Sequence, residues 1–383
     1  MRKIGYVLLT VVCLFLGVYK PVYAAEEETF TVDLTGVWGE YGLGELAQKL
    51  DRLLPEYELD KEAIFGSVMQ GDIWGAIGLV WDGIKGTLLA ELTGMKNLLT
   101  SILLLGILSA LFSNFSDVFR SHQIADVSFY FLYLLLMAIL LQAFSEAARI
   151  TSMTIENIVL FVKMFIPTYF MAVGMASGTA TAVVYYQFML ILAYVVEKIL
   201  LTLLLPLIYS YVLMALMNGI WAEERLNLIL DLLKKGIEVG LKVAMGVVTS
   251  LSLFQSMITP VLDSLRTSAV KKAIAVIPGI GDLAEGVTEM VLGSAVLIKN
   301  SIGVFLLLLL LAVCFIPLIK LLVIACMIKG SAALVGIVSD KRITGCTDHV
   351  GDGSLLLFRT AFTSVALFII TIAIVAYTTN RGM

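Results

Sequence analysis

The amino-acid sequence predicts an all-α protein that crosses a membrane several times, and its composition is the first reason. Hydrophobic residues make up 60% of the 383 positions and charged residues only 15%, whereas soluble domains average about 45–50% and about 25%. The mean hydropathy is +0.97. A net charge of −4 provides no basic surface of the kind that binds nucleic acid. We therefore expect a polytopic helical membrane protein.

The second reason is the recurrence of apolar runs of about 20 residues, the length with which a helix crosses the hydrocarbon core of a bilayer. These runs lie at 97–116, 126–145, 155–175, 180–196, 199–219, 241–259, 302–327 and 355–378. Only Glu197-Lys198 separates the fourth from the fifth, and the sixth is the least apolar. We expect seven or eight transmembrane helices, in a first membrane block over 97–259 and a second over 304–383.

The N-terminus has the features of a secretory signal peptide over residues 1–24. Arg2 and Lys3 precede an apolar stretch, and the residues up to Ala24 fit the cleavage rule. An uncleaved first transmembrane helix is the alternative. In either case the next residues are expected outside the cytoplasm.

Residues 25–96 are predicted to form an extracytoplasmic amphipathic helical region. Apolar residues recur there at helical spacing, and acidic residues outnumber Lys and Arg, which suits the non-cytoplasmic side. Two interpretations stay open. The region is either a small helical subdomain that packs on the membrane domain, or a helix in the outer membrane interface anchored by Trp74 and Trp81.

A polar helical hairpin is predicted over 260–303, between the two membrane blocks. Pro278-Gly279-Ile280-Gly281 break it, and Asp282 with Glu285 three residues later marks a new helix N-terminus. Its Lys and Arg residues fit poorly with an outside loop, so we expect an amphipathic or re-entrant hairpin packed against protein or water.

Charged and helix-breaking residues at membrane depth are the candidates for function, because burying an unpaired charge in hydrocarbon costs on the order of 3 kcal/mol or more. Snorkelling of the lysines and a solvated acidic face of the hairpin are the alternatives. The candidate conduit-lining or gating residues are Lys163, Pro167, Pro278, Gly279, Gly281, Asp282, Glu285, Glu289 and Lys320.

Two loops are expected on the cytoplasmic side, at 220–240 and 328–354. They carry Arg225, Lys234, Lys235, Lys329, Lys341 and Arg342, in line with the positive-inside rule. Within the second loop, Gly351-Asp352-Gly353-Ser354 is predicted to cap the last membrane helix.

No catalytic pattern is found in the sequence. It has neither a His-Glu-x-x-His motif nor a phosphate-binding glycine loop, and it contains two histidines. Cys346 and His349 have a ligand-like spacing, but no second pair accompanies them. We expect no enzyme activity, no cofactor and no metal site.

Seven short blocks of the chain are distinctive. They are FIPTYF at 165–170, SGTATA at 177–182, AVKKAIAVIPGIGD at 269–282, GSAVLIKNSIG at 293–303, PLIKLL at 317–322, DKRITGC at 340–346 and VGDGSLLLFRTAFT at 350–363. Together they make the chain resemble the stage III sporulation protein AE family of endospore-forming Firmicutes. The similarity is densest after residue 260 and weak between 26 and 95.

The resemblance implies a membrane-embedded subunit of the secretion-like channel between mother cell and forespore, needed after engulfment for late forespore gene expression. It implies a place in the mother-cell membrane around the forespore. The implied partners are the other stage III operon proteins, an ATPase and ring-forming subunits, and further copies of the chain. The alternative is an autonomous secondary transporter that feeds small molecules to the forespore, since interrupted membrane segments are typical of transporter sites.

Overall fold

The computed structural model describes residues 59–94, 122–177, 194–220, 226–274, 281–337 and 341–381, together with a few isolated positions before 193. Over 251–296 it describes the course of the helices and not the side chains. All regular structure in these ranges is helical, which confirms the predicted fold class. The predicted signal peptide and most of the predicted span at 97–116 lie outside the described residues.

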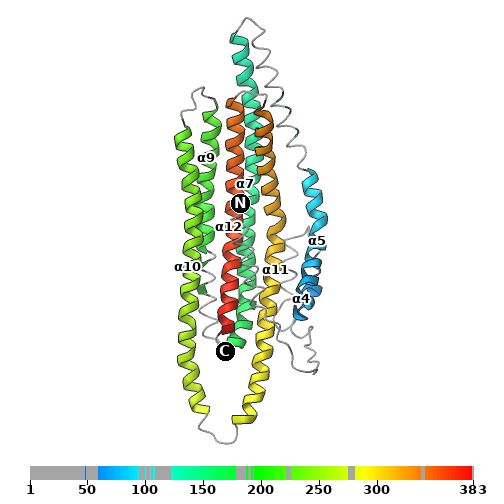
Figure 1. Ribbon diagram of the computed structural model, residues 1–383, viewed down its shortest axis with the longest axis vertical. Coiled ribbons are helices and arrows are strands. Elements are labelled where there is room, and N and C mark those ends of the chain that lie inside the picture. Colours follow the sequence, from blue (N-terminus) through cyan, green and yellow to red (C-terminus); the bar gives the residue numbers. More distant parts are fainter. Residues whose placement is uncertain are drawn as a thin grey trace.

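Long helices run lengthwise beside one another (Figure 1). They are α7 (His122–Ser177), α9 (Leu205–Asn218), α10 (Asn227–Ile274), α11 (Gly281–Val335) and α12 (Lys341–Arg381). The last of them, α12, packs against the other four and forms the centre of the bundle. The lower ends of α10 and α11 project together beyond the C-terminal end of α12 (Figure 1).

Four helical segments in the described residues are long and apolar enough to cross a membrane. They are Phe129–Phe165, Tyr194–Asn218, Leu297–Val335 and Lys341–Ala373. The first differs from the prediction of two separate spans at 126–145 and 155–175, because α7 continues through both without interruption. The total of seven or eight spans stays a prediction.

The predicted break at Glu197-Lys198 is also wrong, because the chain is helical from Tyr194 to Asn218. A π-helical turn, η1 (Leu200–Leu204), leads directly into α9. Pro206 follows at the first positions of α9. Since proline has no N–H for the helix ladder, a wider turn just before it lets the helix continue.

The predicted loops at 220–240 and 328–354 are largely helical. The first is mostly the beginning of α10, and the second holds the end of α11 and the first fourteen residues of α12. The sequence Gly351 to Ser354 therefore lies inside α12 instead of capping it. The physical reason is that the charged side chains of these segments pair with one another between helices, as described below.

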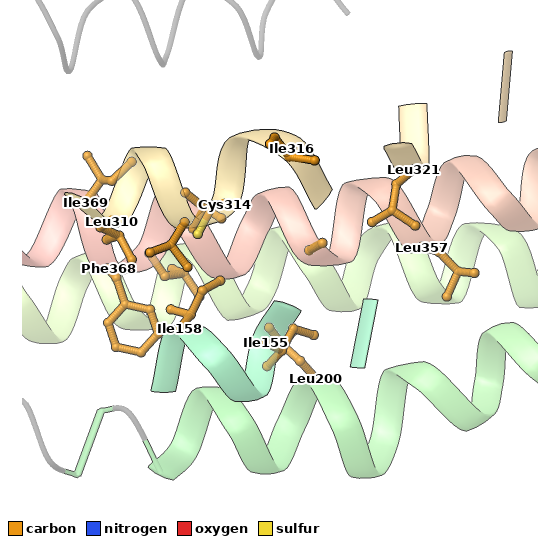
Figure 2. Close-up of a cluster of buried hydrophobic side chains, with 14 of the residues drawn as sticks. Ile155, Ile158, Leu200, Leu310, Cys314, Ile316, Leu321, Leu357, Phe368 and Ile369 are labelled. Carbon is orange, nitrogen blue, oxygen red and sulfur yellow. The ribbon is translucent and has the colours of Figure 1, made fainter. Parts of the chain in front are cut away.

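The core of the bundle is built from branched aliphatic and aromatic side chains of α7, η1, α11 and α12. In Figure 2, Ile158 of α7 lies near Cys314 of α11, Ile155 lies near Leu200 of η1, and all four belong to one buried cluster. Phe368 of α12 packs in the same cluster and is fully buried. Burying a side chain of this kind contributes about 1.5–3 kcal/mol, so this layer fixes which face of each helix turns inward.

Two helices of the N-terminal region, α4 (Lys61–Met69) and α5 (Ile73–Gly94), pack against α11. Gly71 has a φ of 80° and ends α4, and the Asp72 N–H donates to the Ser67 carbonyl, as in a Schellman motif. The Asp72 carboxylate then accepts from the Gly75 N–H at 2.8 Å and caps α5.

Aromatic pairs fix the place of these two helices on α11. Phe65 of α4 packs edge-on against Phe305, and Trp81 of α5 packs edge-on against Phe315, with ring centroids 5.3 and 6.0 Å apart. The described part of the region, residues 59–94, therefore packs on α11, and the choice between the two interpretations stays a prediction. Trp74 is 77% exposed, so its ring is accessible to solvent or lipid.

Gly353 allows α9 and α12 to approach closely. A Cβ at this position would overlap Cγ2 of Val212, whose β-branched side chain is stiff in a helix. Gly330, by contrast, has open space where its Cβ would be.

We predict that Gly353→Ala destabilises the protein by about 1–3 kcal/mol, because the two helices must separate to admit the methyl group. The matched control Gly330→Ala should be neutral or stabilising by up to about 1 kcal/mol, since alanine favours the helix. Thermal unfolding of the detergent-solubilised protein, followed by circular dichroism, measures both changes. Equal stabilities of the two variants would contradict the proposed close contact.

Candidate functional site

A polar stripe runs along the outer face of α7. It consists of side chains at helical spacing on the side of α7 that the other described helices leave uncovered: Gln142, Ser145, Glu146, Arg149, Ser152, Glu156 and Lys163, ending near Pro167. Met153 and Leu160 interrupt it and are 50% and 45% exposed. From Gln142 to Lys163 the stripe is about 32 Å long at 1.5 Å per residue, close to the thickness of the hydrocarbon core of a bilayer.

The stripe lies level with the most apolar part of the bundle. Near the Gln142 end of the stripe, the Phe144 ring lies next to Gly353 of α12. Near the Pro167 end, the Tyr169 ring lies next to Gly303 of α11. Of the two residues that flank Glu156, Ile158 lies near Cys314 of α11 and Ile155 near Leu200 of η1 (Figure 2). α11 carries the most apolar of the four candidate spans. The stripe therefore places polar side chains beside the most hydrophobic part of the bundle.

The charges of the stripe are unevenly compensated. Arg149 pairs with Glu146 at 2.6 Å, and Lys163 pairs with Glu197 of the following helical segment at 3.6 Å. Glu156 accepts a hydrogen bond from the Ser152 hydroxyl at 3.1 Å. In the part of the chain that the structure describes, no cation lies within ion-pair distance of Glu156. One uncompensated negative charge therefore lies on the stripe, about two-thirds of the way from Gln142 to Lys163.

A second polar group, the Asp352 cluster, joins three helices and comprises Lys234, Lys329, Asp348 and Asp352. The Asp352 carboxylate of α12 forms ion pairs with Lys234 of α10 and Lys329 of α11, each with an N–O distance of 2.6 Å. Lys329 also reaches Asp348 at 2.7 Å. The Asp352 side chain is only 12% exposed, against 48% for Asp348. The cluster therefore fixes α10 and α11 in register on α12.

Neighbouring polar contacts extend the same interfaces. The Tyr211 hydroxyl of α9 and Nδ1 of His349 lie 3.0 Å apart. Further along α12, Arg359 pairs with Glu238 of α10. The two ion pairs between α10 and α12 have opposite polarity along the helices, which penalises a shifted alignment because like charges would meet. Among the described residues, no three His, Cys, Asp or Glu side chains come together as a metal site requires.

The residues predicted as a site lie in different places. Lys163 and Pro167 belong to the exposed face of α7, and Lys320 is half-buried on α11, three residues after Pro317. Gly281 begins α11, and the next turns of that helix hold Asp282, Glu285 and Glu289. The side chains of this part, and Pro278 and Gly279 altogether, lie outside the described residues. Their role in lining or gating stays a prediction.

Sequence reasoning missed most of the stripe and the whole Asp352 cluster. The stripe had a signal, because Gln142, Glu146, Arg149, Glu156 and Lys163 recur at helical spacing on one face. The cluster offered only Asp348 and Asp352 at i, i+4, and their partners are at least 19 residues away in sequence.

Comparisons with known proteins point in one direction. The family model described as stage III sporulation protein AE matches residues 59–379. The chain is 20% identical over 417 residues to the stage III sporulation protein AE of Bacillus subtilis (strain 168), covering 100% of this chain and 99% of that protein. No solved structure matches.

We predict that Asp352→Asn lowers stability by on the order of 2 kcal/mol, because two lysines lose their shared carboxylate in a half-buried place. Asp348→Asn, which removes a more exposed carboxylate with one partner, should cost less than about 1 kcal/mol. Thermal melting of both purified variants measures the difference. A larger loss for Asp348→Asn would show that the cluster is not centred on Asp352.

Proposed function

Because this chain belongs to the stage III sporulation protein AE family, and so has a role in sporulation, we propose that it is a membrane-embedded subunit of a channel complex between mother cell and forespore. In this proposal the complex works after engulfment and supports late gene expression in the forespore. The chain crosses the mother-cell membrane around the forespore. It carries no catalytic chemistry of its own.

The polar stripe of α7 is the observation that supports this proposal. A single copy in lipid would expose Arg149, with 65% of its side chain accessible, and Glu156 to hydrocarbon at mid-depth. Charges at that depth are costly unless they face water or protein. Several copies, or this chain with other subunits, remove the cost by turning the stripes toward a shared water-filled path.

The proposed complex contains further proteins. The other stage III operon proteins supply an ATPase and ring-forming subunits, and this chain supplies the wall of the conduit within the membrane. An autonomous transporter, in contrast, would enclose its path within one copy, whereas the stripe lies on the outside of the bundle.

A cysteine-accessibility scan tests the water-filled path. In full-length protein without native cysteines, single cysteines replace Gln142, Arg149, Glu156 or Lys163 in sporulating cells, and a charged, membrane-impermeant maleimide is added to opened cells. We expect labelling at all four positions, because thiols react with maleimide as thiolates in water.

Leu203 and Leu213 provide the matched controls, because they are 57% and 50% exposed on an apolar face. Cysteines there should stay unlabelled, since lipid excludes the reagent. Labelling of the controls with the stripe unlabelled would overturn the conduit. Labelling of both sets would remove the distinction on which the proposal depends.

Co-purification tests the channel complex against the autonomous transporter. A tagged full-length chain, extracted in mild detergent from sporulating cells, should elute in a particle several times its own 41.7 kDa mass together with operon partners. A single copy that transports a small molecule in liposomes without partners would instead support the transporter. Size-exclusion chromatography with mass spectrometry provides the measurement.

A further inference from the structure

We propose that Glu156 makes the conduit selective for cations over anions, and this inference rests on the proposed function. Glu146 and Arg149 cancel each other, and so do Lys163 and Glu197, each pair within ion-pair distance. Glu156 is the charge left over.

The position of Glu156 gives this charge its effect. Its neighbour Ile158 lies near Cys314, within the apolar run of α11, and Ile155 lies near Leu200 (Figure 2). The carboxylate lies on the opposite, exposed side of α7, about two-thirds of the way along the stripe from Gln142 to Lys163. A fixed charge within a path between low-dielectric walls acts on every ion that passes, because the walls concentrate its field.

Ser152 holds the Glu156 side chain in place. Its hydroxyl donates to one carboxylate oxygen from one helical turn earlier, at 3.1 Å. With one such group per copy, an assembly of several copies carries a ring of carboxylates, which is a known basis of cation selectivity in pores.

The chemical class that passes is therefore cations and neutral solutes, with anions disfavoured. One unit charge about 6 Å away in water changes the local concentration of a monovalent ion about threefold, and in opposite directions for cations and anions. The ratio of cation to anion flux should thus exceed that of a neutral path by about tenfold.

Flux measurements on the complex test this inference. The complex is purified from sporulating cells through a tag on this chain and reconstituted into vesicles, and the fluxes of K⁺, Cl⁻ and a neutral sugar are compared. Glu156→Gln should lower the K⁺ to Cl⁻ ratio about tenfold and leave the sugar flux unchanged. Glu156→Asp, which keeps the charge, should retain the preference.

Arg149→Gln should change the K⁺ to Cl⁻ ratio in the opposite direction. It leaves the negative charge of Glu146 uncompensated and should therefore raise the ratio. A defect of folding would lower all three fluxes together in either variant. If the wild-type complex passes the sugar but shows no cation preference, or if Glu156→Gln keeps it, the selectivity inference is overturned and the channel stands. If no tracer passes, the proposed channel is itself overturned, and the inference falls with it.

Discussion

Asp352 sets the arrangement on which the rest of the bundle depends. It is the acceptor that Lys234 and Lys329 share, so one carboxylate of α12 places both α10 and α11. Two cations around one half-buried carboxylate exceed its charge, and the nearby Asp348 restores the balance. Because removing one member of such a group leaves the others uncompensated, the alignment of three helices depends on this group of side chains.

A second constraint acts on the outside. The inner face of α7 is fixed by apolar packing with α11 and α12, so its charged residues have no place in the core. Helical periodicity then collects them on the opposite side, along a length that matches a bilayer. Packing and periodicity together give one long helix an apolar side and a polar side, and in the proposed assembly further subunits would give the polar side an aqueous environment.

The sequence predicted the features that depend on local composition. The helical class follows from the apolar runs, and the predicted hairpin break falls between the observed helix ends at Ile274 and Gly281. Charges within helices were misinterpreted as loops. Lys329 and Asp348 seemed to flank spans because their hydropathy is low, yet they lie in helices and pair with each other across an interface. Such pairing joins residues distant in sequence, and one sequence contains no local signal for it.

The projecting ends of α10 and α11 have a mechanical consequence. Both helices are held at Asp352, and α10 continues for 40 residues from Lys234 to Ile274, about 60 Å at 1.5 Å per residue. The Glu238–Arg359 pair and the buried Leu241 and Val248 hold the first part of that length against the bundle. Only the lower ends of the two helices therefore extend beyond it, and they do so from a base that is fixed by both ion pairs and apolar packing.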